Sequence, residues 1–351
     1  MYQRLNCPSL GVASRPTRKS LQSTPTHFYR RFGFRTNRSA RSFASVKMEA
    51  ESVPKPAPKP APMLKLLYGT AWKKDATEDL VLSALKAGFR GIDTAAQPRH
   101  YNESLVGAAV RSAISSGIVR REDLFIQTKF TSISGQDRNN MPYDPEASLD
   151  DQVHASIASS LKNFTFGNPD EAYIDSLVLH SPLDKLVDTK KVWKTLETYV
   201  PHRIRQLGIS NTDLYTLDQL CQSPDIKIRP ACVQNRFSPA TQWEVMLRAY
   251  CRPRGITFQP FWTLTGNSKL LQSLPVLKLA ESIPIDTARA LYALVLGLGN
   301  MTILDGTRSA THMEEDLKVT ELVDAFVQSS EGQSIWSECL AGFKTVIGEQ
   351  P

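Results

Sequence analysis

Cysteine is scarce in this chain of 351 residues, and the cysteines that are present lack short paired spacings. A disulfide framework or a structural zinc site requires such spacings. The sequence therefore argues against both, predicts no metal centre and is typical of a protein from a reducing compartment. The five cysteines are Cys7, Cys221, Cys232, Cys251 and Cys339.

Long apolar runs are also missing. No segment approaches the roughly 18 consecutive apolar residues that a membrane-spanning helix needs. The hydrophobic content of 41% is that of a globular protein. We therefore expect no membrane partner, and the chain after residue 63 is long enough to form one large core.

Acidic residues are absent from the first 48 positions, which hold ten arginines and lysines. The rest of the chain has 32 basic and 35 acidic residues, so the formal net charge of +7 consists of +10 on this segment and −3 on the remainder. A nucleic-acid-binding domain needs positive charge on its folded surface. We therefore expect no nucleic-acid partner.

Residues 1–47 are rich in arginine, serine and threonine, the composition of a mitochondrial transit peptide. Residues 38–45 resemble a matrix-protease cleavage site, with an arginine just before an aromatic residue and small residues. We predict a mitochondrial location; the alternative is a disordered leader, or a cytoplasmic protein translated from Met48. Residues 48–63 form a proline-rich linker, which favours an extended polyproline conformation.

Residues 64–351 alternate short β-like runs with helical patterns. Typical (β/α)8 barrels occupy about 250 residues, so eight strands and eight helices predict a closed parallel barrel, with an open doubly wound sheet as the alternative. Strands are predicted over 65–68, 89–93, 124–129, 176–180, 206–209, 231–235, 256–261 and 301–304. Helices are predicted over 78–87, 103–115, 150–163, 190–199, 214–221, 242–251, 287–296 and 312–327.

A Rossmann fingerprint, G-x-G-x-x-G between a strand and a helix, is absent. The similar string that begins at Gly297 and includes Gly299 lacks the third glycine and is better explained as the end of a helix. Any dinucleotide must therefore bind by another route.

Polar residues follow several predicted strands. In a parallel barrel the carboxyl ends of the strands face the active site, so Asp93, Lys129 and His180 should share one rim with Tyr101, which follows the second strand. Ser210, Asn211, Gln234 and Asn235 follow the fifth and sixth strands.

These residue types suit proton transfer to a carbonyl oxygen. A free phenol has a pKa near 10, and a neighbouring ammonium favours the phenolate and so eases proton donation. Asp93 would hold Lys129, Lys129 would activate Tyr101, and His180 would donate a hydrogen bond to the carbonyl. Carbonyl reduction also needs a hydride, which no side chain supplies, so a nicotinamide cofactor is implied.

The body of the chain resembles the aldo-keto reductases from Leu66 to about Val327. The resemblance rests on the order and spacing of residues 68–72, 88–95, 124–129, 174–182, 207–211, 233–235, 306–309 and 312–316. It implies a (β/α)8 barrel, reversible NAD(P)-dependent carbonyl reduction of the alcohol dehydrogenase type, and Asp93, Tyr101, Lys129 and His180 as the catalytic tetrad. It also implies that Ser210, Asn211 and Gln234 hold the nicotinamide carboxamide and that Phe261 stacks on the nicotinamide ring.

The tyrosine departs from the family pattern. The family sets it about five positions after the aspartate, where this chain has Pro98, and Tyr101 comes eight positions after Asp93. The proline restricts this rebuilt loop. Tyr101 is predicted as the acid, with His100 or Tyr143 as its substitutes.

The cofactor choice rests on the segment after the eighth strand. Gly306 stands where the family often has a basic residue, and Asp316 where it has an asparagine. The helix that begins near Ser309 offers free N–H groups to a phosphate, and Arg308 adds a positive charge, whereas Asp316 would repel it. NADP is predicted, with NAD as the alternative. The predicted cofactor-binding residues here are Gly306, Thr307, Arg308, Glu315 and Asp316.

A small carbonyl compound is the predicted substrate. Trp72, Phe130 and Trp262, with the long loop 131–149, are expected to line the mouth of an apolar pocket. We expect a monomer or weak oligomer and simple packing of the tail, residues 329–351. The competing hypothesis is a non-catalytic, cofactor-binding regulatory barrel that binds a protein partner; the complete tetrad favours the enzyme.

Overall fold

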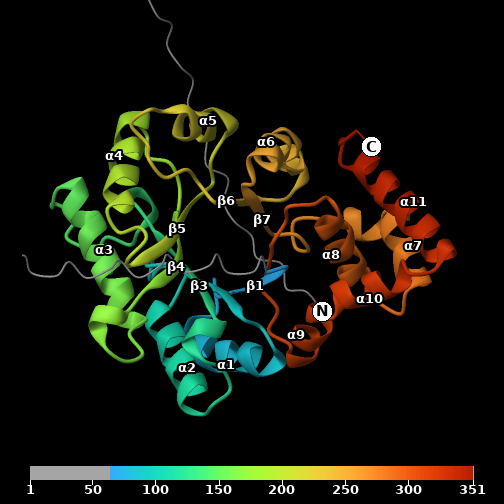
Figure 1. Cartoon of the computed structure of the whole chain (residues 1–351), viewed down its shortest axis with the longest axis horizontal. Helices are drawn as coiled ribbons and strands as arrows, with labels where there is room; N and C mark the ends of the chain where they lie inside the picture. Colours follow the sequence, from blue (N-terminus) through green and yellow to red (C-terminus); the bar gives the residue numbers. More distant parts are fainter. Residues whose placement is uncertain (1–63, 351) are drawn as a thin grey trace, which may run out of the picture. The chain divides into compact units, whose positions relative to one another are not determined.

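Eight parallel strands form one sheet, in which consecutive strands pair and β8 pairs with β1. Figure 1 shows the strands at the centre of the molecule, with helices around them. The computed structural model describes residues 64–350. On the remaining side, Phe258 of β7 hydrogen bonds with Asn300 and Thr302, just before β8, which nearly closes the barrel. The strands are β1 (Leu66–Gly69), β2 (Gly91–Asp93), β3 (Phe125–Phe130), β4 (Ile174–Leu179), β5 (Ile204–Ser210), β6 (Cys232–Arg236), β7 (Thr257–Phe261) and β8 (Ile303–Asp305).

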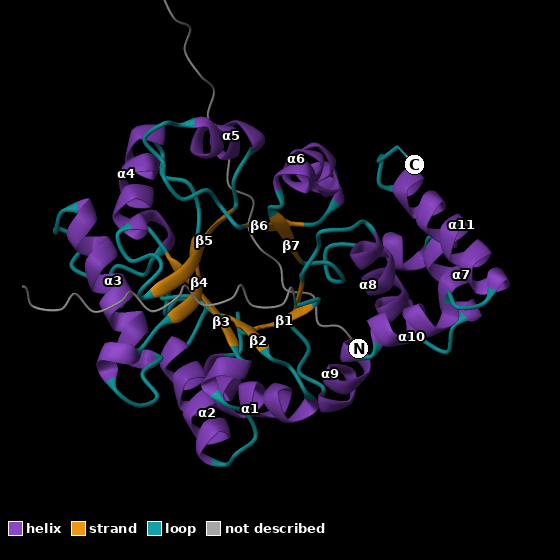
Figure 2. Ribbon diagram, in the orientation of Figure 1, coloured by secondary structure: helices purple, strands orange, loops and turns teal. Residues whose placement is uncertain are grey.

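Helices surround the strands (Figure 2). Several begin at a side chain that accepts a hydrogen bond from the first turn, such as Asn102, Ser148 and Asp213. They are α1 (Thr77–Ala87), α2 (Glu103–Ser115), α3 (Leu149–Asn163), α4 (Leu186–Glu197), α5 (Leu214–Gln222), α6 (Val245–Cys251), α7 (Leu274–Ser282), α8 (Thr287–Gly297), α9 (Ala310–Leu317), α10 (Val319–Phe326) and α11 (Ser330–Val346).

The strands are covered on both faces, as in other parallel sheets. Every residue of β4 is buried, and Trp193 of α4 is among the largest fully buried side chains. Because side chains alternate along a strand, residues two apart share a face. Gln127 and Lys129 of β3 therefore lie on one face, and Phe130 lies on the other.

The predicted (β/α)8 barrel is confirmed, but the strict alternation of eight helices is wrong. A helix that was not predicted, α7, lies between β7 and α8. The predicted helix 242–251 begins only at Val245, because Gln242 and Trp243 have positive φ angles. The predicted helix 312–327 is two helices, α9 and α10, separated at Lys318.

The sequence Gly297-Leu-Gly299 does end a helix: α8 stops at Gly297, and Gly299 has a φ of 81°. The predicted packing role of the tail agrees with α11, whose Cys339 and Phe343 are buried. The predicted leader, 1–47, and the predicted linker, 48–63, lie outside the described residues.

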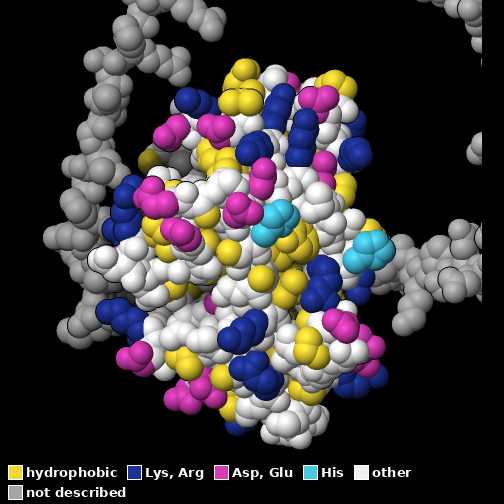
Figure 3. Space-filling model, turned by 90° about the vertical axis from the view of Figure 1, so that its left-hand side faces the viewer, with side chains coloured by type: hydrophobic (Ala, Val, Ile, Leu, Met, Phe, Trp, Pro, Cys, Tyr) yellow, Lys and Arg dark blue, Asp and Glu magenta, His cyan; other side chains and the backbone are white. Residues whose placement is uncertain are grey.

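Within residues 64–350, Cys221, Cys232, Cys251 and Cys339 are free thiols, and no group of side chains could hold a metal ion. No helix in this range is long and apolar enough to cross a membrane. On the face shown in Figure 3, basic and acidic side chains are interspersed. This agrees with the slightly negative formal charge of the chain after residue 48.

Candidate active site

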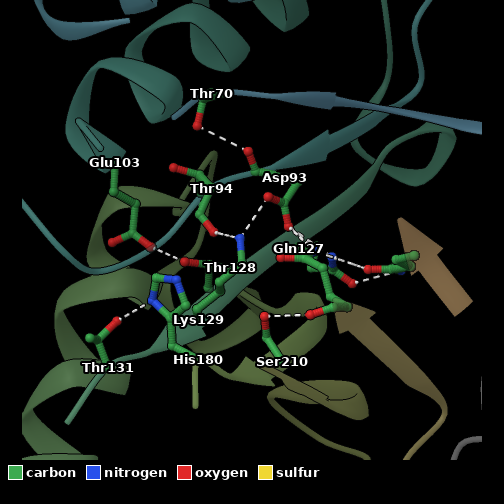
Figure 4. A network of polar contacts seen from close by, with 12 residues as sticks. Thr70, Asp93, Thr94, Glu103, Gln127, Thr128, Lys129, Thr131, His180 and Ser210 are labelled. Atoms are coloured by element: carbon green, nitrogen blue, oxygen red, sulfur yellow. Dashed lines mark hydrogen bonds and ion pairs between the residues drawn. The ribbon is translucent and has the colours of Figure 1, made fainter. Parts of the chain in front are cut away.

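A buried ion pair lies at the carboxyl ends of β2 and β3 (Figure 4). Lys129 Nζ is 2.6 Å from Asp93 Oδ2, and the two side chains are 0% and 2% exposed. Lys129 also donates to the carbonyl oxygen of Thr94 at 2.8 Å. Burial lowers the pKa of Lys129, but the charges of Asp93 and Tyr101 and the hydrogen bonds to both residues together outweigh it, and the net pKa is raised. Lys129 is therefore a fixed cation at neutral pH.

Tyr101 lies against this cation. The Lys129 ammonium is 5.1 Å from the centroid of the Tyr101 ring. Burial raises the pKa of Tyr101, while the Lys129 charge and its hydrogen bond lower it; the net pKa is raised. The predicted effect of the ammonium is therefore present, but desolvation outweighs it in this state. The phenol is a fully protonated donor whose phenolate would be stabilised by Lys129.

The two substitutes for Tyr101 are engaged elsewhere. Tyr143 is buried and donates its hydroxyl to the carbonyl oxygen of Thr131 at 2.6 Å. His100 stacks on Trp72, with ring centroids 3.9 Å apart. Tyr101 is the tyrosine that the structure brings to Lys129.

His180 follows β4 and meets Tyr101 edge to face, with ring centroids 6.0 Å apart. Burial lowers the pKa of His180 to about 3, helped by the charges of Lys129 and His100. The imidazole is neutral, and Thr131 Oγ1 is 2.7 Å from its Nδ1. When Thr131 donates to Nδ1, the proton of the ring is on Nε2, which is then a hydrogen-bond donor. Sequence reasoning missed Thr131, although it comes two residues after Lys129.

Ser210 and Asn211 lie at the same end of the barrel. Ser210 Oγ donates to the backbone oxygen of Gln234 at 2.6 Å, and Asn211 Nδ2 donates to that of His180 at 2.9 Å. Arg236, which was not predicted, donates to Asn211 Oδ1 at 3.0 Å. Its guanidinium lies 5.5 Å from the centroid of the Phe261 ring.

The segment after β8 is tied to the loop after β1. Lys73 Nζ donates to the backbone oxygens of Gly306 and Thr307 at 2.5 and 3.1 Å. Arg308 donates to the backbone oxygen of Trp72 at 3.2 Å. Lys73 is buried and was not predicted as a site residue; burial, together with the charge of Arg308, lowers its pKa to about 8. Two cations therefore lie where α9 begins.

Asp316 is buried, and its environment changes its expected role. Burial and then the charge of Asp305 raise the pKa of Asp316 to about 8. Asp316 is therefore mostly uncharged at neutral pH, and the expectation that it repels a phosphate is not supported. Glu315, by contrast, forms an ion pair with Arg289 at 3.6 Å.

Two of the three predicted pocket residues are at the surface. Trp72 and Trp262 are 55% and 49% exposed. Phe130 is 0% exposed and packs on Tyr143, so its predicted place at the mouth is wrong. Its position directly after Lys129 turns it to the opposite face of β3. A cavity of about 300 Å³ beside Tyr101 is lined by Trp72, Lys74, Asp75, Pro98, Arg99, His100, Tyr101 and Asn102.

Two glutamines below the rim were not singled out in the sequence. Gln127 of β3 donates to Asp93 Oδ1 at 2.8 Å, and Gln259 of β7 accepts from Gln127 at 2.7 Å. Gln127 comes two residues before Lys129, and Gln259 two residues before Phe261. This spacing was the signal that could have placed them on the inner face.

The residues present fit a nicotinamide dinucleotide. Gln234 is 3% exposed, yet within residues 64–350 no hydrogen bond is made to its Oε1. This acceptor suits the N–H groups of a carboxamide, and the aromatic face of Phe261 is on the neighbouring strand. The cations near Thr307 and the amino end of α9 suit phosphate.

Comparison with known proteins identifies the family of the chain. Residues 65–273 match the model of the aldo/keto reductase family. The chain is 32% identical over 232 residues to the glyoxal reductase of Bacillus subtilis, covering 65% of this chain and 72% of that protein. It is 27% identical over 244 residues to an aldehyde reductase of Saccharomyces cerevisiae, covering 61% and 69%.

Among solved structures, an aldo-keto reductase from a deep-sea metagenome library superposes with a TM-score of 0.62 at 21% identity. The alignment covers 80% of this chain and 93% of that one, which supports the barrel fold. The match of the family model and the glyoxal reductase together establish the family. The chain belongs to the aldo/keto reductase family of oxidoreductases.

Proposed function

We propose that the protein is an NADPH-dependent reductase that converts aldehydes or ketones to alcohols. The observation that carries the proposal is the fully buried Lys129–Asp93 ion pair with Tyr101 against its ammonium. A solvent-free cation next to a phenol is costly to build for stability alone. It suits a group that must give up a proton during the reaction.

Each tetrad residue has one task. His180 is neutral and donates its Nε2–H to the carbonyl oxygen of the substrate, which orients the carbonyl. A nicotinamide cofactor held by Gln234 and Phe261 would supply the hydride that carbonyl reduction needs. Tyr101 gives its phenolic proton to the oxygen as negative charge develops there, and Lys129 stabilises the phenolate that remains. Asp93 keeps Lys129 charged and in place.

The preference for NADPH over NADH rests on charge near the predicted 2′-phosphate site. Arg308 and Lys73 are cations beside Thr307, and the amino end of α9 presents the positive end of its helix dipole to the same place. Asp316 is mostly uncharged at neutral pH, so it adds little repulsion. We expect a lower dissociation constant for NADPH than for NADH; the opposite order would overturn this preference.

Replacing Tyr101 by phenylalanine tests the mechanism. Tyr101→Phe should lower kcat by a factor of about 10² to 10⁴, the range attributed to general acid catalysis, while the dissociation constant for NADPH stays within about twofold. Tyr199→Phe is the matched control, because the Tyr199 hydroxyl lies 2.6 Å from His154 Nδ1, between α3 and the end of α4. Retained turnover in Tyr101→Phe would contradict the assignment of Tyr101 as the general acid.

The relatives guide the choice of substrates. One is named a glyoxal reductase and another an aldehyde reductase, so a panel should contain small dicarbonyls, aliphatic and aromatic aldehydes, and ketones. Oxidation of NADPH with any of them supports the proposal. No turnover despite measured NADPH binding would favour the non-catalytic regulatory barrel.

We also propose import into mitochondria, on the composition of residues 1–47. Fusion of this segment to a fluorescent protein tests it. A cytoplasmic signal from the fusion would overturn this location without affecting the proposed activity.

A further inference from the structure

Three glutamines form one connected group in the barrel interior, below the catalytic rim, and Figure 4 labels one of them, Gln127, beside Asp93. They are Gln127 of β3, Gln234 of β6 and Gln259 of β7, and all three are buried, with 0%, 3% and 3% exposure. An amide can present either its N–H₂ or its oxygen to a neighbour. Which way each of these amides points is therefore a chemical question.

Asp93 answers it. It forms an ion pair with Lys129 at 2.6 Å, and a carboxylate in such a pair can only accept hydrogen bonds. Gln127 Nε2 lies 2.8 Å and Gln234 Nε2 lies 3.0 Å from Asp93 Oδ1. Both amides must turn their N–H₂ groups toward Asp93, since their oxygens would be repelled.

Gln259 completes the arrangement. Its Oε1 accepts the second N–H of both neighbours, from Gln127 at 2.7 Å and from Gln234 at 3.1 Å. Its own Nε2 donates to Gln127 Oε1 at 3.2 Å, and the Cys232 thiol approaches the same oxygen at 3.7 Å. Every contact in the group agrees with a single orientation of the three amides.

Within the described residues, one hydrogen-bond acceptor of the group, Gln234 Oε1, has no donor. Both hydrogens of the Gln234 amide are used by Asp93 and Gln259, and within the described part of the chain Oε1 receives no hydrogen bond. We infer that Gln259, with Gln127, is a positioning residue that clamps the Gln234 amide so that its oxygen receives the N–H₂ of the nicotinamide carboxamide. This inference rests on the proposed use of a nicotinamide cofactor.

A cofactor analogue without the N–H₂ group tests the clamp. The reduced 3-acetylpyridine analogue of NADPH carries an acetyl group in place of the carboxamide, so it cannot donate to Gln234 Oε1. Dissociation constants of NADPH and of the analogue are measured by quenching of tryptophan fluorescence, without substrate. The wild-type protein should bind NADPH about tenfold more tightly, the effect of one hydrogen bond of about 1.4 kcal/mol.

In Gln259→Met the amide of Gln234 loses one of its two hydrogen-bond partners. The preference for NADPH, which is the dissociation constant of the analogue divided by that of NADPH, should fall at least threefold. Gln259→Glu should restore it to within twofold of wild type, because a protonated carboxyl group presents the same accepting oxygen and donating hydrogen. Gln152→Met is the matched control: Gln152 is also buried, but it donates to the backbone oxygens of Pro145 and Ala147 at the start of α3. Its loss should lower the melting temperature and leave the preference unchanged.

The outcomes distinguish failure of the proposed function from failure of the glutamine clamp. If the wild-type protein binds neither dinucleotide, the proposed function fails. If it binds both equally, Gln234 does not serve as the acceptor and the inference fails, while carbonyl reduction stands. An unchanged preference in Gln259→Met, or an equal fall in Gln152→Met, also overturns the clamp. Should Gln259→Met not fold, Gln259→Thr, whose side chain is too short to reach both amides, is expected to show the same loss and takes its place.

Discussion

The burial of the Lys129–Asp93 ion pair predicts a large loss in the free energy of unfolding when either partner is removed. Removing one partner of a fully buried pair costs about 3–5 kcal/mol, because the other charge remains buried without its partner. In Lys129→Met, the Asp93 carboxylate keeps its two hydrogen bonds from Gln127 and Gln234. We therefore expect a loss at the lower end of that range, about 3 kcal/mol in the free energy of unfolding.

A double-mutant cycle measured by urea denaturation tests this reasoning. Asp93→Asn should also destabilise the protein, since it leaves the Lys129 ammonium without its counter-ion. The double variant Lys129→Met, Asp93→Asn should lose less than the two single losses combined, with a coupling energy of about 1–3 kcal/mol. All three variants should lack turnover. Strict additivity would refute the argument that the pair acts as a unit.

Two further predictions concern the barrel away from the ion pair. Because the pKa of Asp316 is raised to about 8 in the folded state and is near 3.9 in an unfolded chain, the folded state holds the proton more tightly and wild-type stability should fall as the pH rises from about 4 to 8. Asp316→Asn should flatten this decline in thermal melts and be the more stable protein at pH 8; identical pH profiles would contradict it. Gly107→Ala should lower stability by about 1–3 kcal/mol, because a Cβ there would lie 2.2 Å from the backbone oxygen of Asn163 at the end of α3. Ser112→Ala on the same helix is the control, and equal melting temperatures of the two variants would show that the helices have room to shift.

The rim residues borne by strands could be predicted because strand ends in a parallel barrel meet at one end. Asp93, Lys129 and His180 each end or follow a strand, so an approximate strand assignment was enough to bring them together. The charge state of Asp316 could not be predicted in the same way. It depends on Asp305 and on burial, and only the fold shows both.

Other misses come from patterns that the sequence does contain. Alternation along β3 turns Phe130 away from the face of Lys129, so its burial could have been predicted from the same strand that placed the lysine. The helix α7 begins with Leu274 and Pro275 directly after Ser273, and a proline in the first turn after a serine is a helix-start signal that was overlooked. The late start of α6, by contrast, had no signal in the sequence, because the backbone at Gln242 and Trp243 adopts positive φ angles that neither residue type indicates.

The longer loop before Tyr101 still brings this tyrosine to Lys129. Gln97 is buried, its backbone oxygen accepts from the N–H of Tyr101 at 3.1 Å, and its side chain accepts from the N–H of His100 at 3.1 Å. The chain thus makes a tight turn in which the two residues after Gln97 are exposed to solvent. The backbone oxygen of His100 then accepts from Trp72 at 2.7 Å, which ties the turn to the loop after β1. The extra residues are absorbed outside the barrel, and Tyr101 still lies over Lys129. Proton donation depends on the distance between the Tyr101 ring and the Lys129 ammonium, which is 5.1 Å. The loop can therefore be lengthened without loss of the tetrad as long as both ends of the turn remain anchored.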